Sequence, residues 1–108
     1  MNNEQNPSYI SDNIQSGQCV TKNPATAYTV LPEDNWIVCG ANSIAITLDS
    51  NSNSPVWITS IDGTTQRTGC TIVVGSQDFV IADGGCAALC VRVAGGSSWA
   101  IVGAKTAS

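Results

Sequence analysis

The absence of histidine limits the catalytic chemistry that this chain can perform. Without an imidazole, the Ser-His and Cys-His pairs that activate a nucleophile cannot form. Two carboxylates remain as an acid/base option, and Glu33 and Asp34 are adjacent in the sequence. Neighbours on a turn are expected to point apart into solvent, and the other aspartates fall where Asp commonly bonds the backbone of turns. The sequence therefore predicts a protein that is not an enzyme and has no catalytic residues.

Five cysteines offer a second kind of chemistry, either disulfide formation or metal binding: Cys19, Cys39, Cys70, Cys86 and Cys90. An odd count leaves at least one thiol without a partner within the chain. Cys86 and Cys90 are close in sequence, but zinc usually takes four ligands from close pairs of Cys and His, and the other three cysteines lie apart. We therefore expect free thiols that act as small buried hydrophobic side chains, with no structural metal and no cofactor.

The segment Asp49-Ser50-Asn51-Ser52-Asn53 resembles the first half of a calcium-binding loop. An EF-hand loop needs Gly at its sixth position and Glu at its twelfth, where this chain has Ser54 and Ser60. No flanking helices are indicated by the hydrophobic pattern. The sequence therefore predicts a polar hairpin loop at this place, and no metal site.

Three tryptophans could either stack against sugars or fill a packed interface: Trp36, Trp57 and Trp99. Each of them lies within an apolar stretch that has the composition of a β-strand. Aromatic side chains bury large areas and dominate the energetics of cores and interfaces. We therefore expect the three tryptophans to anchor the core or a subunit interface, and we keep a carbohydrate platform as the alternative.

The elements that position these residues are short strands. From Tyr28 onward, β-branched and aromatic runs alternate with turn signals such as Asp62-Gly63, as in an all-β domain. The pattern predicts a compact antiparallel β-sandwich or β-barrel-like domain over residues 28–108, with helix close to absent. The predicted strands are Tyr28–Leu31, Trp36–Cys39, Ser43–Leu48, Val56–Ile61, Cys70–Val74, Asp78–Ile81, Leu89–Ala94 and Trp99–Val102.

Residues 1–27 have a different composition and are interpreted as an extended N-terminal arm. The segment is polar and shows little hydrophobic periodicity, so it cannot bury enough surface to fold alone. It is either a disordered leader or an arm that becomes ordered on a partner, and the sequence leaves both open. Its main apolar residues, Tyr9, Ile10 and Ile14, are the candidates for contact with a partner.

Composition restricts the partners. The net charge is −4, and the four Lys and Arg residues are scattered along the chain, whereas binding to nucleic acid or an anionic membrane requires clustered cations. No apolar run approaches the roughly 18 residues of a transmembrane helix, and the N-terminus lacks the features of a signal peptide. We therefore expect no nucleic-acid partner, no membrane association and no secretion.

The amount of apolar surface predicts a homo-oligomer. Hydrophobic residues make up 43% of the chain and charged residues only 11%. The predicted strand Val56–Ile61 is apolar on both of its faces, and a single small sandwich cannot easily bury both faces of such strands. Oligomerisation would cover the remaining apolar surface and the exposed sheet edges.

Two segments carry a resemblance to a known family. The first, Tyr28-Thr29-Val30-Leu31-Pro32-Glu33-Asp34-Asn35-Trp36-Ile37-Val38, leads into Ile44-Ala45-Ile46-Thr47-Leu48. The second, Gly95-Gly96-Ser97-Ser98-Trp99-Ala100-Ile101-Val102-Gly103, closes the pattern near the C-terminus. Together they resemble a small β-domain of bacteriophage tail fibres, head fibres and capsid decoration proteins, and the resemblance extends from Tyr28 to Gly103.

This resemblance implies a homotrimer on the virion surface that is made in the host cytoplasm. The initial Met and the lack of heptads or a triple-helical stalk favour a complete small decoration (cement) protein over a fibre. Such a protein would bind the major capsid protein and reinforce the phage head, with Tyr9, Ile10 and Ile14 as the capsid anchors of the arm. The alternative is a receptor-binding or fibre-tip module that recognises host surface glycans.

Overall fold

The computed structural model describes residues 19–81, 87–93 and 98–106, and all regular secondary structure within these ranges is β. The predicted all-β class is therefore confirmed. Within the same ranges, no helix is long and apolar enough to cross a membrane.

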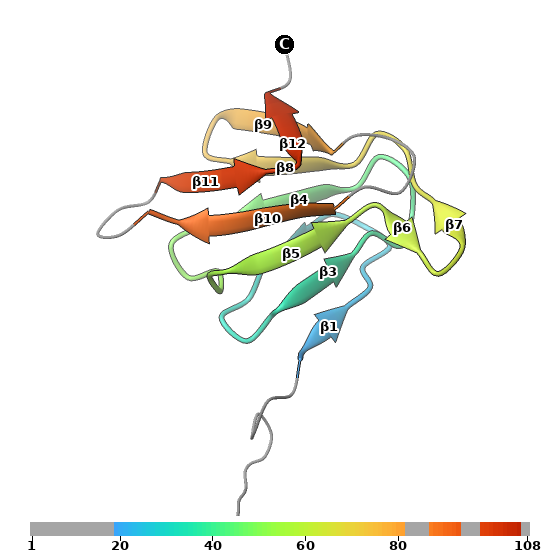
Figure 1. Ribbon diagram of the computed structural model, residues 1–108, viewed down its shortest axis with the longest axis horizontal. Helices are drawn as coiled ribbons and strands as arrows, with labels where there is room; N and C mark the ends of the chain where they lie inside the picture. Colours follow the sequence, from blue (N-terminus) through green and yellow to red (C-terminus); the bar gives the residue numbers. More distant parts are fainter. Residues whose placement is uncertain (1–18, 82–86, 94–97, 107–108) are drawn as a thin grey trace, which may run out of the picture.

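Two five-stranded sheets pack face to face (Figure 1). Sheet A contains, in spatial order, β1 (Thr21–Lys22), β3 (Trp36–Val38), β5 (Val56–Thr59), β10 (Ala87–Arg92) and β11 (Trp99–Val102). Sheet B contains, in spatial order, β12 (Ala104–Thr106), β9 (Gln77–Ile81), β8 (Thr71–Val74), β4 (Ala45–Leu48) and β2 (Tyr28–Thr29). A small hairpin of β6 (Ile61–Asp62) and β7 (Thr65–Gln66) lies between β5 and β8 in the chain.

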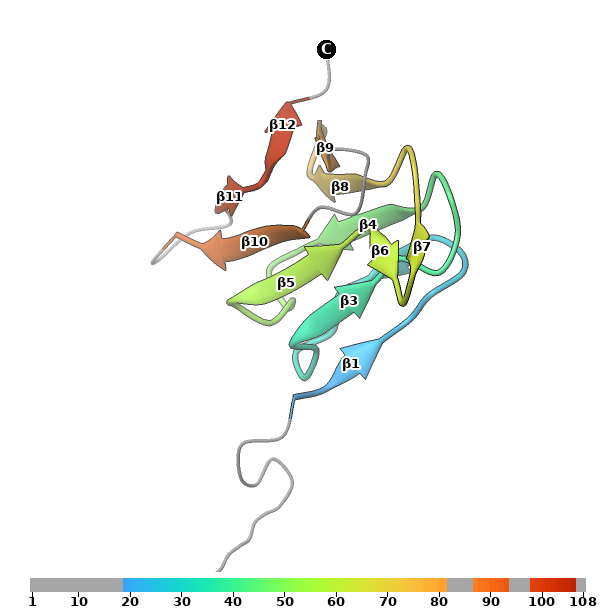
Figure 2. The same ribbon diagram turned by 45° about the vertical axis from the view of Figure 1, so that its right-hand side comes forward.

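The first part of the chain coils between the sheets instead of forming hairpins within one sheet. It passes from β1 to β2, from β3 to β4 and from β5 to β8, and each step leaves sheet A for sheet B (Figure 2). As a result, β1, β3 and β5 are parallel in sheet A, and β2, β4 and β8 are parallel in sheet B. Parallel neighbours require such crossover connections.

Antiparallel pairing, which we expected throughout, occurs only in the later part of the two sheets. There β9 pairs with β8 and β12, and β10 pairs with β5 and β11. The expectation was wrong for the coiled half because the turns after β2, β3 and β4 lead to the opposite sheet, and turn residues alone do not show this.

The hydrophobic core lies between the two sheets. Strand alternation sends every second side chain inward, as in β4, where Ile46 and Leu48 are buried between partly exposed neighbours. The core residues are Val30, Ile37, Cys39, Ile44, Ile46, Leu48, Val56, Ile58, Cys70, Ile72, Ile81, Ala88 and Cys90. Free thiols at Cys39, Cys70 and Cys90 are therefore core side chains as expected, whereas the free thiol of Cys19 is exposed and Cys86 lies outside the described residues.

Part of the predicted arm belongs to the β-domain. Strand β1 lies at residues 21–22 and pairs with β3, and the Val20 carbonyl accepts hydrogen bonds from the amides of Asn35 (2.9 Å) and Trp36 (3.1 Å). The boundary at residue 27 was thus too late, because two-residue strands without an apolar pattern carry no signal in sequence. Residues 1–18, with Tyr9, Ile10 and Ile14, lie outside the described residues.

Candidate functional site

The outer face of sheet A carries a continuous row of apolar side chains. Ile37, Ile58 and Ala88 point into the core, so the residues beside them on β3, β5 and β10 point outward. The strand register then aligns Trp36 with Trp57, Trp57 with Leu89, and Leu89 with Val102. We call Trp36, Trp57, Leu89, Val91 and Val102 the apolar face.

The apolar face is open to solvent in the single chain. Trp57 is 39% exposed, Val91 38% and Val102 69%, although all three are large apolar residues. The rings of Trp36 and Trp57 are stacked, with centroids 5.5 Å apart. This stacked pair stabilises the outer face of sheet A, since aromatic pairs across neighbouring strands contribute to the stability of a sheet.

No ionisable side chain lies on this side of sheet A among the described strand residues. They are Thr21, Trp36, Val38, Trp57, Thr59, Ala87, Leu89, Val91, Ala100 and Val102. The outer face of sheet B is different, because its register rows include three threonines and two charges. These rows are Thr29, Thr47, Val73 and Asp78, and Ala45, Thr71, Val80 and Lys105. The sandwich therefore has one face suited to water and one suited to contact with another apolar surface.

Trp99 has a different position from the other two tryptophans. It pairs with Arg92 on β10 and packs against the core cluster, with the Arg92 guanidinium 4.9 Å from its ring centroid. Arg92 also donates through its guanidinium to the Ser52 carbonyl. Trp99 is thus a side chain of the sandwich interior, whereas Trp36 and Trp57 lie on the outside, a distinction that composition alone did not provide.

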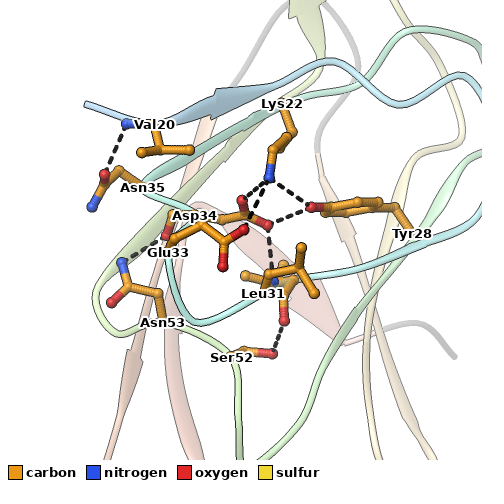
Figure 3. Close-up of polar contacts among 10 residues, drawn as sticks. Val20, Lys22, Tyr28, Leu31, Glu33, Asp34, Asn35, Ser52 and Asn53 are labelled. Atoms are coloured by element: carbon orange, nitrogen blue, oxygen red, sulfur yellow. Dashed lines mark hydrogen bonds and ion pairs between the residues drawn. The ribbon is translucent and has the colours of Figure 1, made fainter. Parts of the chain in front are cut away.

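A buried polar cluster around Asp34 joins the first three strands of the chain (Figure 3). The Asp34 side chain is fully buried, and its Oδ1 accepts from Lys22 Nζ at 2.6 Å. Its Oδ2 accepts from Tyr28 OH at 2.6 Å and from the Leu31 amide at 2.8 Å. We call Lys22, Tyr28 and Asp34 the Asp34 cluster; it ties β1 and β2 to the turn that precedes β3.

The expectation that both Glu33 and Asp34 point into solvent was wrong for Asp34. Glu33 is exposed, whereas Asp34 turns inward because four donors around it replace water: Lys22, Tyr28, the Leu31 amide and, at its backbone carbonyl, Asn53. Asp and Asn in a turn such as Pro32-Glu33-Asp34-Asn35 favour bonds between side chain and nearby backbone, but Lys22 and Asn53, the long-range partners of Asp34, leave no signal in the local sequence. The cluster contains a single buried carboxylate, so it does not offer the carboxylate pair of acid/base catalysis.

The segment that resembles a calcium loop uses its oxygens for internal hydrogen bonds. Asp49 Oδ1 accepts from the Asn51 amide at 2.9 Å, and Ser52 Oγ donates to the Val30 carbonyl at 2.8 Å. Asn53 Nδ2 donates to the Asp34 carbonyl at 2.6 Å. The segment thus supports the turn that carries Asp34, and these residues are structural.

Electrostatics within the Asp34 cluster favour the charged forms of both partners. Burial alone would raise the pKa of Asp34, but hydrogen bonds from Lys22, Tyr28 and the Leu31 amide outweigh it and hold that pKa below its usual value. The hydrogen bond to Asp34 raises the pKa of Lys22. Burial raises the pKa of Tyr28, which therefore stays a neutral donor. Asp34 Oδ1 forms the ion pair with Lys22, and Oδ2 accepts hydrogen bonds from Tyr28 and the Leu31 amide. Such complete hydrogen bonding offsets the free-energy cost of removing a buried ion pair from water.

We expect the cluster to make the protein less stable in acid. Because the folded-state pKa of Asp34 lies below the unfolded value of about 3.9, its stabilisation is present above that pH and is lost as the pH falls through the folded-state pKa. Urea unfolding of the wild type between about pH 2 and 7 should show this loss. In the Asp34→Asn variant, that acid-dependent part should be reduced; an identical pH profile would contradict the assignment to Asp34.

Fold and surface together define an all-β, two-sheet protein with a charge-free apolar outer face among its described residues. Comparisons with protein-family models, curated protein sequences and solved structures gave no match.

Proposed function

We propose that this protein is a virion structural protein: a small homotrimeric decoration (cement) protein that binds the outside of a phage head. The observation that carries the proposal is the apolar face of sheet A, which suits packing against protein and lacks groups for catalysis. The resemblance of Tyr28–Gly103 to phage decoration and fibre domains supports the same assignment. On this proposal, the protein assembles in the host cytoplasm and functions on the virion surface.

The partner of the apolar face is a second copy of this chain. The protein carries a net charge of −4, so copies repel one another wherever their acidic groups approach. The outer side of sheet A avoids this cost, since its described strand residues bear no charge. Self-association through this face also removes tryptophan, leucine and valine surface from water, which is the main favourable term in such contacts.

The size of the apolar face makes it the centre of an interface. The apolar face extends over four strands, β3, β5, β10 and β11. With a strand spacing of about 4.8 Å and about three residues along each strand, its area is on the order of 200 Å². A standard interface takes about 800 Å² from each partner, so neighbouring edges and loops would supply the periphery. The stacked Trp36 and Trp57 are suited to the centre, where tryptophan is enriched among the residues that dominate binding energy.

Capsid binding is assigned to surfaces other than the apolar face. The arm residues Tyr9, Ile10 and Ile14 are the proposed contacts with the major capsid protein. Each arm would bind weakly, because ordering it costs conformational entropy. Three arms held in one trimer bind much more tightly than one, and many trimers on a shell would reinforce it against internal pressure.

Images of virions that contain this protein test the assignment. We expect density for three copies at sites on the outside of the shell, where capsid subunits meet. Density at the end of a fibre would contradict decoration and select the receptor-binding alternative.

A glycan-binding function is favoured by one specific observation. Trp57 is 39% exposed and stacked on Trp36, and exposed aromatic faces are suited to stacking on sugar rings. The two functions make opposite demands on the apolar face, because a face between copies is closed to glycans. Binding of the assembled protein to a glycan array, lost in Trp57→Ser, would select the second function.

Removal of the arm is expected to separate folding from capsid binding. A variant that lacks residues 2–18 keeps β1 and the Val20 contacts with Asn35 and Trp36, so it should remain folded and oligomeric. Its binding to undecorated capsids, measured by co-sedimentation, should fall by at least about 100-fold through lost multivalency. Wild-type binding by this variant would move the capsid contact to the β-domain.

A further inference from the structure

Cys39 and Cys70 come from opposite sheets and meet in the core. Cys39 directly follows β3 of sheet A, and Cys70 directly precedes β8 of sheet B. Both are 0% exposed and belong to the same core cluster. Cys70 Sγ donates to the carbonyl of Ala41, two residues beyond Cys39, at 3.7 Å, and the Cys70 thiol lies close enough to Cys39 to raise its pKa.

The backbone holds these two thiols together from both sides. The crossover that follows Cys39 and the one that precedes Cys70 run beside each other: the Ser43 amide donates to the Thr68 carbonyl at 2.8 Å, and the Thr71 amide donates to the Ile44 carbonyl at 2.9 Å. The Cys39 amide is itself bonded to the Thr59 carbonyl at 3.0 Å. The meeting of the thiols therefore follows from the coiled path of the chain, not from the rotamer of one side chain.

We propose that Cys39 and Cys70 form an intrachain disulfide site, which closes when the chain folds in the presence of a disulfide oxidant such as oxidised glutathione. The Cys39 thiolate attacks one glutathione sulfur and releases one reduced glutathione. The Cys70 thiolate then attacks the Cys39 sulfur of this mixed disulfide and releases the second. Two protein thiols are oxidised to one S–S bond, and one glutathione disulfide is reduced to two thiols.

Burial decides when this reaction takes place. Burial and the neighbouring Cys70 raise the pKa of Cys39 to about 12, so the reactive thiolate is scarce at neutral pH once the protein has folded. The bridge therefore forms during folding or transient opening, and a reducing cytoplasm leaves the thiols free. This site is independent of the proposed virion function.

The other described cysteines provide a contrast. Burial alone raises the pKa of Cys90 to about 12, with no contribution from another thiol, and Cys19 is exposed. Among the described cysteines, Cys39 and Cys70 are thus the two whose thiols influence each other. A Cys19→Ser/Cys86→Ser/Cys90→Ala variant leaves this pair as the only cysteines of the chain.

Peptide mapping after oxidative refolding tests the site. The full-length wild type and the two-cysteine variant are refolded in reduced and oxidised glutathione, alkylated while unfolded, and digested with trypsin. The cleavage sites at Lys22, Arg67 and Arg92 place Cys39 in residues 23–67 and Cys70 in residues 68–92. We expect these two peptides to be linked, with a mass two hydrogens below the sum of the two free peptides.

Thermal unfolding gives a second readout. The bridge closes a loop of roughly 30 residues, so the unfolding midpoint of the bridged protein should be about 10 °C or more above that of the reduced protein.

The control is Cys39→Ala in the two-cysteine variant, which should show neither the link nor the oxidant-dependent rise. If that control does not fold, the map of the two-cysteine variant remains decisive, because its peptide 68–92 contains Cys70 as the only cysteine, whereas that of the wild type also contains Cys86 and Cys90. Alkylated Cys39 and Cys70 in a wild type refolded to its native circular dichroism would overturn the proposal. A link from Cys39 to Cys90, or no rise in the unfolding midpoint on bridging, would overturn it as well.

Discussion

A Val91→Glu variant is expected to be monomeric where the wild type is trimeric. Val91 is 38% exposed on the apolar face, so a glutamate can be accommodated in the single chain without disturbing the core. In the proposed interface, its carboxylate would be buried against tryptophan and aliphatic groups without a counter-charge. An uncompensated buried charge costs about 3–5 kcal/mol, which weakens association by more than about 100-fold. Sedimentation velocity over a dilution series measures this change.

The matched control is Thr29→Glu, which places the same charge on the outer face of sheet B. Thr29 is exposed and lies in a register row that already ends in Asp78. This variant should retain the wild-type mass, and both variants should retain the wild-type circular dichroism. Equal loss of association in both would show that added charge, and not the apolar face, decides the oligomeric state.

An Asp34→Asn variant is expected to lose about 2–4 kcal/mol of stability, because it breaks a fully buried charged network. The amide can accept from one side only, and its NH₂ group would face a donor, either the Leu31 amide or Lys22. For a chain of this size, such a loss lowers the unfolding midpoint by about 10 °C or more. Thermal and urea unfolding measure the change.

Glu33→Gln is the control for this variant. This substitution also replaces a carboxylate by an amide, one residue earlier. Glu33 is exposed, and its Oε2 lies 3.7 Å from Lys22 Nζ, so the free energy of unfolding should change by no more than about 0.5 kcal/mol. If both substitutions cost the same, the burial of Asp34 is not the source of the stabilisation.

Local patterns in the sequence predicted most of the strands. The alternation in Ile44-Ala45-Ile46-Thr47-Leu48 became β4, with Ile46 and Leu48 in the core. The all-β class followed from such runs and from turn signals such as Asp62-Gly63, which connects β6 and β7. These features depend only on residues near each other in the chain, so they can be recognised without the fold.

The pairing of the strands and the outer face of the sheet could not be predicted in this way. Trp36 aligns with Trp57, whereas Tyr28 aligns with Ile46, so successive coils have unequal lengths and no repeat is visible. Whether a tryptophan faces inward or outward also depends on which strands lie beside it, as the contrast between Trp57 and Trp99 shows. Lys22 and Tyr28, the partners of Asp34, come close to it because the chain alternates between the two sheets from β1 to β3, which no local sequence pattern shows.

The mass of the wild-type protein in solution tests most directly the claim that the apolar face packs against a second copy. Sedimentation equilibrium should give three times the chain mass of 11.1 kDa at micromolar concentration. The Val91→Glu variant should give the single-chain mass under the same conditions. A wild type that stays monomeric up to about 100 μM, a concentration at which even a weak specific interface would be populated, would contradict the claim.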